Sequence, residues 1–359
     1  MSGKTVFVVG AGASSEVGLP LGFDLKTLIT HKLKLDRDGN AQGTTDENLR
    51  AIFNRIANKT NDKNHIFGEF QKKANQMARG LPLARSIDNY LHDHSSDPQI
   101  VQIGKLAIVS SILEAERKSD LWIDPDRRPA DSTQWIGRKR YENSWYPALF
   151  QLMTDKCKAS DLKERFKKYS FIIFNYDRCI EHFLERALKV YYPVLDDDDI
   201  FEIMSNLNLE HPYGRLGTLG WQVKGKGGPD VEFGGQPGSE DKYIELSENI
   251  LTFTEAEKLV EGTVNSIQSQ VQQCERLVFL GFGFIPLNLD LIAPFNQQYT
   301  RRGSFKCIAT VKGISEPNRD QYVKVLANRL NTVEGNILTE SCSCAELISG
   351  YSSYLEDVN

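Results

Sequence analysis

A run of small residues near the N-terminus has the composition of a phosphate-binding turn: Gly10, Ala11, Gly12, Ala13 and Ser14. The run follows directly on an apolar, β-branched segment, and backbone N–H groups in such a turn can approach a pyrophosphate without obstruction by side chains. The fingerprint of dinucleotide-binding proteins has a third glycine where this sequence has Ser15. The pattern is therefore compatible with dinucleotide binding, and also with close packing of a helix on a strand without any ligand.

A second candidate site consists of Asn175 and Asp177, which come directly after an apolar run at residues 171–174. Ligands of α/β sheets bind at the carboxyl ends of the strands, so an amide and a carboxylate at this edge are candidate ligand contacts. Asp177 is also a good helix N-cap and Asn175 a good turn residue. A purely structural role is the alternative.

Two later segments add a possible base and a second glycine pair. His211 stands at the end of a short expected strand and could accept a proton, although a lone histidine is more often structural. Another apolar run, residues 276–280, is followed by Gly281, Phe282, Gly283 and, shortly after, Asn288. Backbone at such a glycine pair could face an adenosine, and a tight turn explains the glycines almost as well.

The elements that must position these residues are short apolar strands that alternate with helical patterns. We expect strands at residues 5–9, 171–174, 276–280 and 306–310, with shorter ones near 207–211 and 337. This alternation predicts an α/β fold with a doubly wound, mostly parallel, Rossmann-like sheet. Long helical periodicity over residues 34–166 predicts a helical insertion that caps the ligand site, whereas residues 1–33 and 167–359 would form the nucleotide-binding α/β domain.

Loops and one helix start are predicted from turn residues and capping patterns. Residues 119–144 have the prolines and charged turns of a surface loop, and residues 214–238 are rich enough in glycine for a mobile loop. Thr254 and Glu257 form a capping-box pattern ahead of a helix.

The composition is that of a globular protein, with 359 residues of which 40% are hydrophobic and 25% charged. The 43 Lys and Arg residues face 48 Asp and Glu residues, so no overall basic field would recruit nucleic acid or anionic lipid. No apolar run is long enough to cross a membrane, and the six cysteines form no C-x-x-C pair. We therefore expect a cytoplasmic protein without a bound metal.

In combination and in this order, the segments resemble the sirtuin-like family, and specifically its divergent bacterial branch found in antiphage defence. The family's opening motif, Gly-Ala-Gly-x-Ser and then Gly-(Ile/Leu)-Pro, is matched by Gly10, Ala11, Gly12, Ser14, Gly18, Leu19 and Pro20. The family's Asn-x-Asp element is matched by Asn175 and Asp177, and its late glycine pair by Gly281 and Gly283. Its His-Gly element is matched imperfectly by residues 211–214. The resemblance covers only residues 5–29, 170–188, 207–217 and 276–290.

The sequence departs in three places from the protein deacylases of that family. Those enzymes continue with Asp-Phe-Arg where this chain has Leu21, Gly22 and Phe23, and they carry two zinc-binding C-x-x-C pairs that this chain lacks. Tyr213 also stands directly before the glycine where the family has its histidine. The base would thus be His211 or Tyr213, which point to opposite faces of an extended segment.

The resemblance implies an NAD glycohydrolase that cleaves its substrate NAD to nicotinamide and ADP-ribose, as an NAD-depleting effector of antiphage defence. Asn175 would fix the ribose and the attacking water, His211 would accept a proton, and Asp177 would order the turn or the ribose hydroxyls. The backbone of residues 10–14 would hold the pyrophosphate. The adenosine side would be formed by Gly281, Phe282, Gly283 and Asn288.

Two other functions stay open at this point. One is an NAD-dependent protein deacylase or ADP-ribosyltransferase, which the missing zinc and Asp-Phe-Arg elements disfavour, and the other is a non-catalytic, nucleotide-sensing assembly subunit. Because unrestrained NAD cleavage would kill the host, we expect a homo-oligomer whose activity a separately encoded partner controls. The resemblance suggests a HerA-type ATPase or a short Argonaute as that partner, with no direct binding of nucleic acid or membrane.

Overall fold

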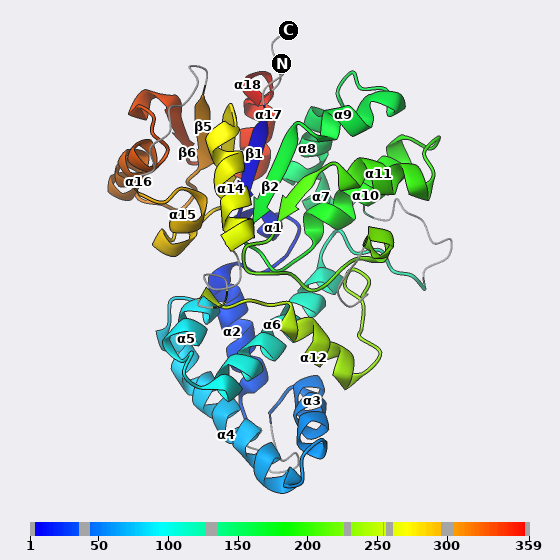
Figure 1. Ribbon diagram of the computed structural model, residues 1–359, viewed down its shortest axis with the longest axis vertical. Helices are drawn as coiled ribbons and strands as arrows, with labels where there is room; N and C mark the ends of the chain where they lie inside the picture. The colour runs from blue at the N-terminus through cyan, green and yellow to red at the C-terminus, as the bar shows by residue number, and fades with distance from the viewer. Residues whose placement is uncertain are drawn as a thin grey trace.

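A computed structural model describes residues 4–35, 44–126, 135, 137–225, 231–253, 255, 261–295 and 305–355. In these residues six parallel strands form one sheet in the order β3-β2-β1-β4-β5-β6 (Figure 1). They are β1 (Thr5–Val9), β2 (Tyr169–Ile173), β3 (Asn208–Glu210), β4 (Arg276–Leu280), β5 (Lys306–Thr310) and β6 (Ile337–Glu340). The order reverses between β1 and β4, which confirms the predicted doubly wound, Rossmann-like sheet.

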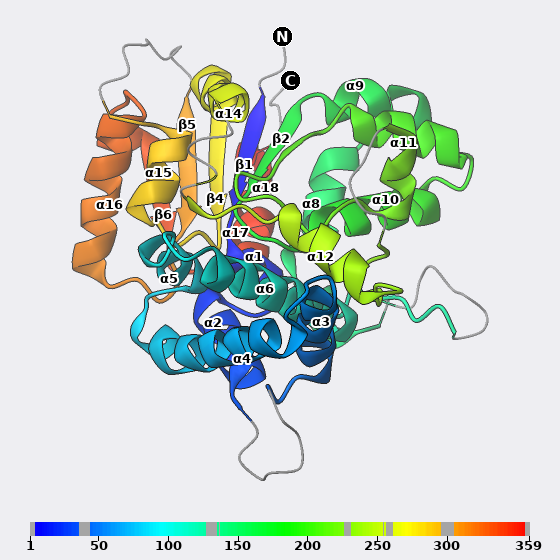
Figure 2. The ribbon, with the colours of Figure 1, turned by 60° about the horizontal axis from the view of Figure 1, so that its bottom comes forward.

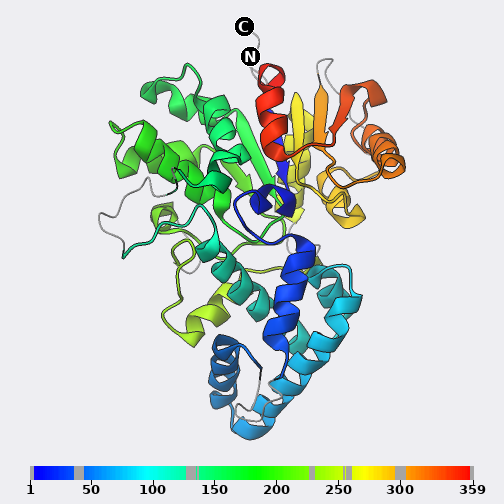
Figure 3. The ribbon, with the colours of Figure 1, turned by 180° about the vertical axis from the view of Figure 1, so that it is seen from behind.

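The central strands are buried on both faces because their side chains alternate between two hydrophobic cores. Phe7 and Val9 of β1 point into one core, and Val6 and Val8 point into the other. The first core is covered by α8 (Trp145–Thr154), α9 (Leu162–Phe166), α10 (Cys179–Tyr191), α11 (Asp197–Ser205), α17 (Cys344–Gly350) and α18 (Ser352–Leu355). The second is covered by α14 (Glu261–Gln273), α15 (Pro286–Ile292) and α16 (Glu316–Arg329). Figure 1 looks onto the face with α14, and Figure 3 onto the face with α17.

A third hydrophobic core lies in a group of helices beyond the carboxyl edge of the sheet, which we call the cap (Figure 1, Figure 2). Its helices are α2 (Gly22–Leu33), α3 (Glu47–Asn58), α4 (Lys63–Gly80), α5 (Ile87–Asp93), α6 (Pro98–Lys118) and α12 (Glu240–Glu248). The cap and the expected insertion at residues 34–166 differ in extent. Helices α2 and α12 lie outside that range and contribute to the cap core, whereas α8 and α9 lie inside it and pack on the sheet.

The two segments expected as loops contain ordered and buried parts. Within residues 119–144, α7 (Lys139–Glu142) forms a short helix and Trp135 is 2% exposed. Within residues 214–238, a 3-10 turn η3 (Gly220–Gly225) forms and Leu216 and Phe233 are buried. The other 3-10 turns are η1 (Leu81–Leu83), η2 (Ala159–Asp161) and η4 (Glu334–Asn336).

Some expected features fall where the chain is not described. Residues 226–230 of the glycine-rich segment, and Thr254 and Glu257 of the capping-box pattern, lie outside the described residues. Among the helices that are described, none is long and apolar enough to cross a lipid bilayer.

A fully buried ion pair joins the cap to the sheet. Glu116 of α6 and Arg178, which directly precedes α10, both have side chains with 0% exposure, and Arg178 Nη2 lies 2.6 Å from Glu116 Oε2. Arg178 also donates to the carbonyls of Val231 and Glu232, and Glu116 accepts from the N–H of Gly234. These hydrogen bonds satisfy both charges, so breaking the pair would leave an uncompensated charge in the interior.

The turns after β1 and β4 contact each other through glycine backbone. The N–H of Gly10 donates to the carbonyl of Leu280 over 2.9 Å, and the N–H of Gly12 to that of Gly281 over 3.0 Å. A Cβ added to Gly10 would lie 2.5 Å from the Gly281 oxygen, and one added to Gly281, whose φ is +57°, would lie 2.1 Å from the Ala13 nitrogen. The close approach of the two turns thus requires glycine at both positions.

Replacing Gly281 should therefore destabilise the whole fold. We expect Gly281→Ala to lower the free energy of unfolding by ~2 kcal/mol or more, because it combines an unfavourable φ with a backbone clash. Gly283→Ala is the matched control, since a Cβ there would meet only the Ile285 Cγ1 atom at 3.8 Å. Urea unfolding followed by circular dichroism measures both, and equal stability of the two variants would contradict the assignment.

Candidate active site

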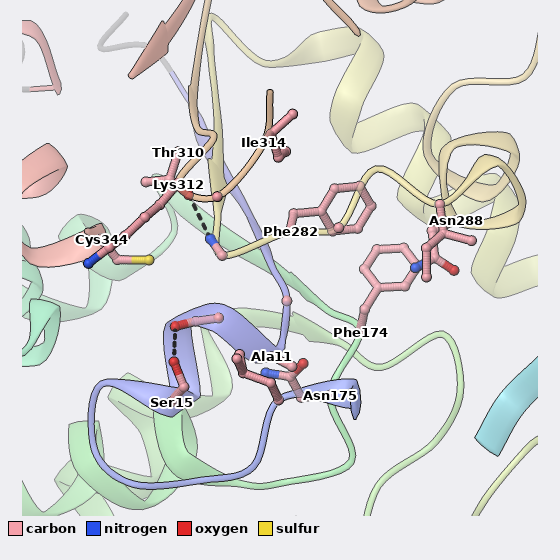
Figure 4. A pocket seen from close by; sticks show the side chains of 18 of the residues that line it. Ala11, Ser15, Phe174, Asn175, Phe282, Asn288, Thr310, Lys312, Ile314 and Cys344 are labelled. Atoms are coloured by element: carbon pink, nitrogen blue, oxygen red, sulfur yellow. Dashed lines mark hydrogen bonds between the residues drawn. The ribbon is translucent and has the colours of Figure 1, made fainter. Parts of the chain in front are cut away.

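A cavity of about 1020 Å³ lies at the carboxyl ends of β1 and β4, between the sheet and the cap. The backbone of Gly10–Gly12 and of Gly281–Gly283 lines it, and Figure 4 shows the side chains around it. Ligand sites commonly measure about 300–1,000 Å³, so there is room for a molecule as large as a dinucleotide. The point where strand order reverses is also where doubly wound sheets bind nucleotides.

Asn175 is the predicted site residue that the structure places most clearly in this cavity (Figure 4). Its side-chain nitrogen donates to Ser14 Oγ over 3.0 Å, and Ser14 Oγ donates in turn to Asp177 Oδ1 over 3.2 Å. Ser14 belongs to α1 (Ala11–Ser15), which starts directly after Gly10. Since the nitrogen is engaged, and no hydrogen bond from the described residues reaches the amide oxygen, that oxygen can accept a hydroxyl or a water proton.

Asp177 lies behind Ser14 and does not line the cavity. It also accepts the backbone N–H of Cys179, at the start of α10, over 3.2 Å. Burial raises the pKa of Asp177 to about 6, and the charge of Glu116 acts in the same direction. Asp177 therefore orders the turn, which was one of its two expected roles, and is too deep to hold ribose hydroxyls.

His211 was expected to accept a proton at this site, but its ring faces away from the cavity. The Nδ1 atom lies 3.2 Å from the carbonyl oxygen of Asn175, and Nε2 lies 2.9 Å from Glu181 Oε1. The Asn175 carbonyl and the Glu181 carboxyl thus engage both ring nitrogens, and neither nitrogen is left for a substrate. The geometry makes His211 a residue that holds Asn175 in place, and not a base that contacts a substrate.

The partner of His211 explains why the ring points this way. Glu181 sits on α10 with a fully buried side chain, and Arg215 Nη1 lies 3.0 Å from the same oxygen that His211 contacts. Burial alone would raise the pKa of Glu181, but the charges of His211 and Arg215 bring it down to about 2. The ionised carboxylate of Glu181 attracts Arg215 and holds the imidazole of His211 by a hydrogen bond, so the ring does not line the cavity.

Tyr213, the other candidate for the base position, does line the cavity. Its hydroxyl donates to Asn288 Oδ1 over 2.7 Å. Asn288 lines the cavity with Gly281 and Gly283, and this bond places it next to Tyr213. Its expected contact with an adenosine stays a prediction. Phe282 and the two glycines line the cavity as expected, whereas Ala13 and Ser14 lie behind its surface.

Several lining residues escaped the sequence analysis. From the ends of β5 and β6 and the start of α16 come Thr310, Lys312, Ser315, Asn318, Cys342 and Cys344. Thr310 ends an expected strand, which was a usable signal because parallel strands end at a common edge. From the cap and the segment after α12 come Ser86, Asp88 and Phe253, for which no motif gave a signal.

A metal-binding cluster or a similar protein of known function would indicate which reaction the cavity supports. Within the described residues, no group of three or more His, Cys, Asp or Glu side chains is arranged to hold a metal ion. Comparison of the chain with protein-family models and with curated proteins gives no match.

The role of His211 can be tested through stability. We expect His211→Ala to lower the free energy of unfolding by ~2 kcal/mol or more, because it removes one of the two side chains that bind the buried carboxyl of Glu181. A residue that acted only as a base would leave unfolding unchanged. His65→Ala, at an exposed position on α4, serves as the control, and urea denaturation of both variants measures the difference.

A second test concerns Asp177 and pH. Its pKa rises from 3.8 to about 6 on folding, so the folded state binds the proton more tightly than the unfolded state. The contribution of Asp177 to stability is therefore full below about pH 4 and is lost, by roughly 3 kcal/mol, as the pH rises through 6. The Asp177→Asn variant should lack this loss in thermal unfolding between pH 4 and 7. Identical pH profiles for variant and parent would refute the assignment.

Proposed function

We propose that the chain is an NAD glycohydrolase that releases nicotinamide and leaves ADP-ribose. The observation that carries the proposal is the oriented amide of Asn175, which lines a cavity of dinucleotide size whose walls include two side-chain-free glycine turns. Glycine backbone suits a pyrophosphate, and an amide oxygen suits a sugar hydroxyl or a water molecule. The resemblance of the motifs to sirtuin-like proteins of antiphage defence supports the same activity and an NAD-depleting role.

The reaction needs an oriented nucleophile more than it needs a strong base. The bond between ribose C1′ and the nicotinamide nitrogen breaks with its electron pair moving to the nitrogen, and the sugar passes through an oxocarbenium-like state. Water held by Asn175 then adds to C1′, and its proton is released to solvent. Holding the amide through Ser14, and its backbone carbonyl through His211, keeps this geometry in place before the substrate binds.

The orientation of His211 favours one second candidate function. No histidine is found among the described residues that line the cavity, so an imidazole base is lacking there. A chain that binds NAD or ADP-ribose as a sensor, without cleaving it, fits this observation. A protein deacylase is supported by neither the sequence nor the cavity.

Product analysis separates the two functions. Incubation of the purified chain with NAD, followed by chromatography, should yield nicotinamide and ADP-ribose in equal amounts. We expect Asn175→Ala to lower turnover at least ~10²-fold because the nucleophile loses its orientation, while circular dichroism stays unchanged. Asn328→Ala, at an exposed position on α16, is the control and should keep full turnover.

Two outcomes would count against the proposal. Unchanged turnover in a folded Asn175→Ala protein would remove this residue from the mechanism. Tight binding of NAD by calorimetry without any product would favour the sensor function.

A further inference from the structure

The end of the cavity nearest the cap is walled by aromatic side chains. Phe174, Tyr213, Phe253 and Phe282 all line it. The ring centroids of Phe174 and Tyr213 lie 5.7 Å apart, those of Tyr213 and Phe253 4.9 Å, and those of Phe174 and Phe282 5.2 Å, so the four form one continuous cluster. Aromatic faces carry partial negative charge and attract cations.

The cap adds a carboxyl group to the same cavity. Asp88 of α5 lines the cavity, and its Oδ1 atom accepts a hydrogen bond from the hydroxyl of Tyr176, the residue between Asn175 and Asp177. Burial raises the pKa of Asp88, and the hydrogen bond from Tyr176 acts against that rise. A cation bound nearby would favour the ionised carboxylate further.

The other lining charges are distributed differently. Glu16 also lines the cavity, but its carboxylate accepts N–H groups from Trp145 at the start of α8 and from Cys344 at the start of α17. Lys312, after β5, is the one lysine or arginine among the described lining residues. Figure 4 shows Lys312 on the opposite side of the cavity from Phe174 and Asn288. The positive charge of Lys312 thus lies away from Phe174, whereas Asp88 is bound by Tyr176, which follows Phe174 by two residues.

We propose that Asp88 and the aromatic cluster bind a flat, positively charged ring, and that they make the site specific for oxidised NAD over its reduced form. This inference rests on the proposed function, because it takes the ring to be the nicotinamide of that substrate. It places the nicotinamide beside Phe282 and Asn288, in place of the adenosine that was first expected there. The oxidised ring is planar and cationic, whereas the dihydronicotinamide ring is neutral. A carboxylate and aromatic faces therefore stabilise the first and give the second no charge interaction.

The same contacts would help the product to leave. When the bond to ribose C1′ breaks, its electron pair neutralises the ring, and the released nicotinamide loses its attraction to Asp88. The positive charge moves to the ribose beside Asn175. Asp88 is then a specificity-determining residue for the substrate and holds the neutral product weakly.

Equilibrium binding tests the inference without relying on turnover. The full chain carrying Asn175→Ala, which should consume NAD at least ~10²-fold more slowly, is titrated with oxidised NAD, NADH and ADP-ribose by calorimetry. We expect oxidised NAD to bind about tenfold tighter than NADH. Adding Asp88→Asn, whose amide oxygen can still accept from Tyr176, should reduce the preference to about threefold or less. Asp93→Asn, at an exposed position on the same helix, should keep it.

Binding of ADP-ribose, which lacks the ring, reports whether each variant retains its fold and the rest of the cavity. Equal affinity for oxidised NAD and NADH in the Asn175→Ala protein itself would overturn the inference without any change at Asp88, and would leave the cleavage assignment standing. An unchanged preference in a variant with Asp88→Asn that still binds ADP-ribose would also overturn it. Failure of all three nucleotides to bind would overturn both the inference and the proposed function.

Discussion

The contact between the glycine turns after β1 and β4 is the constraint on which the site depends. The two strands are neighbours at the point where the sheet changes direction, and their turns meet backbone to backbone, with Gly12 donating to Gly281. A Cβ at Gly10, Gly12 or Gly281 would lie 2.1–2.7 Å from a backbone atom of the opposite turn and push the turns apart. Glycine at these positions therefore lets the two turns meet, and the turns line the cavity with backbone.

Ser14 connects the glycine turn after β1 to the Asn-x-Asp segment after β2 by hydrogen bonds. Its hydroxyl receives the amide of Asn175 and donates to Asp177, so the first turn sets the orientation of the strand-end residues on β2. The backbone carbonyl of Asn175 is bound by His211, and His211 is bound in turn by Glu181. Asn175 is thus fixed from three elements, α1, α10 and the segment after β3.

The sheet and its glycine turns could be predicted because their signals are local. A short β-branched run such as Thr5–Val9 indicates a strand that is buried on both faces, and the glycines directly after it indicate a tight turn. Asn175 could be predicted for the same reason, since it directly follows a strand. The position of the His211 ring could not be predicted, because it depends on the carboxyl group of Glu181, which lies on another element, α10, and binds the ring away from the cavity. Asp88 gave no signal at all, since α5 packs with the cap and reaches the cavity only through the tertiary arrangement. The extent of the cap was equally hidden, because whether α2 or α8 faces the sheet depends on packing partners rather than on helical period.

The buried pair between Glu116 and Arg178 has a consequence for how a ligand reaches the cavity. Swinging the cap away from the sheet as a rigid body would break this pair, and the segment 231–234, whose backbone bonds both side chains, would lose its contact with one of them. These contacts oppose rigid-body opening of the cap, so we expect a ligand to reach the cavity through smaller movements of the segments at its rim. The cavity is preorganised in this sense, and little of the ligand's binding free energy is used to bring the cap and the sheet together.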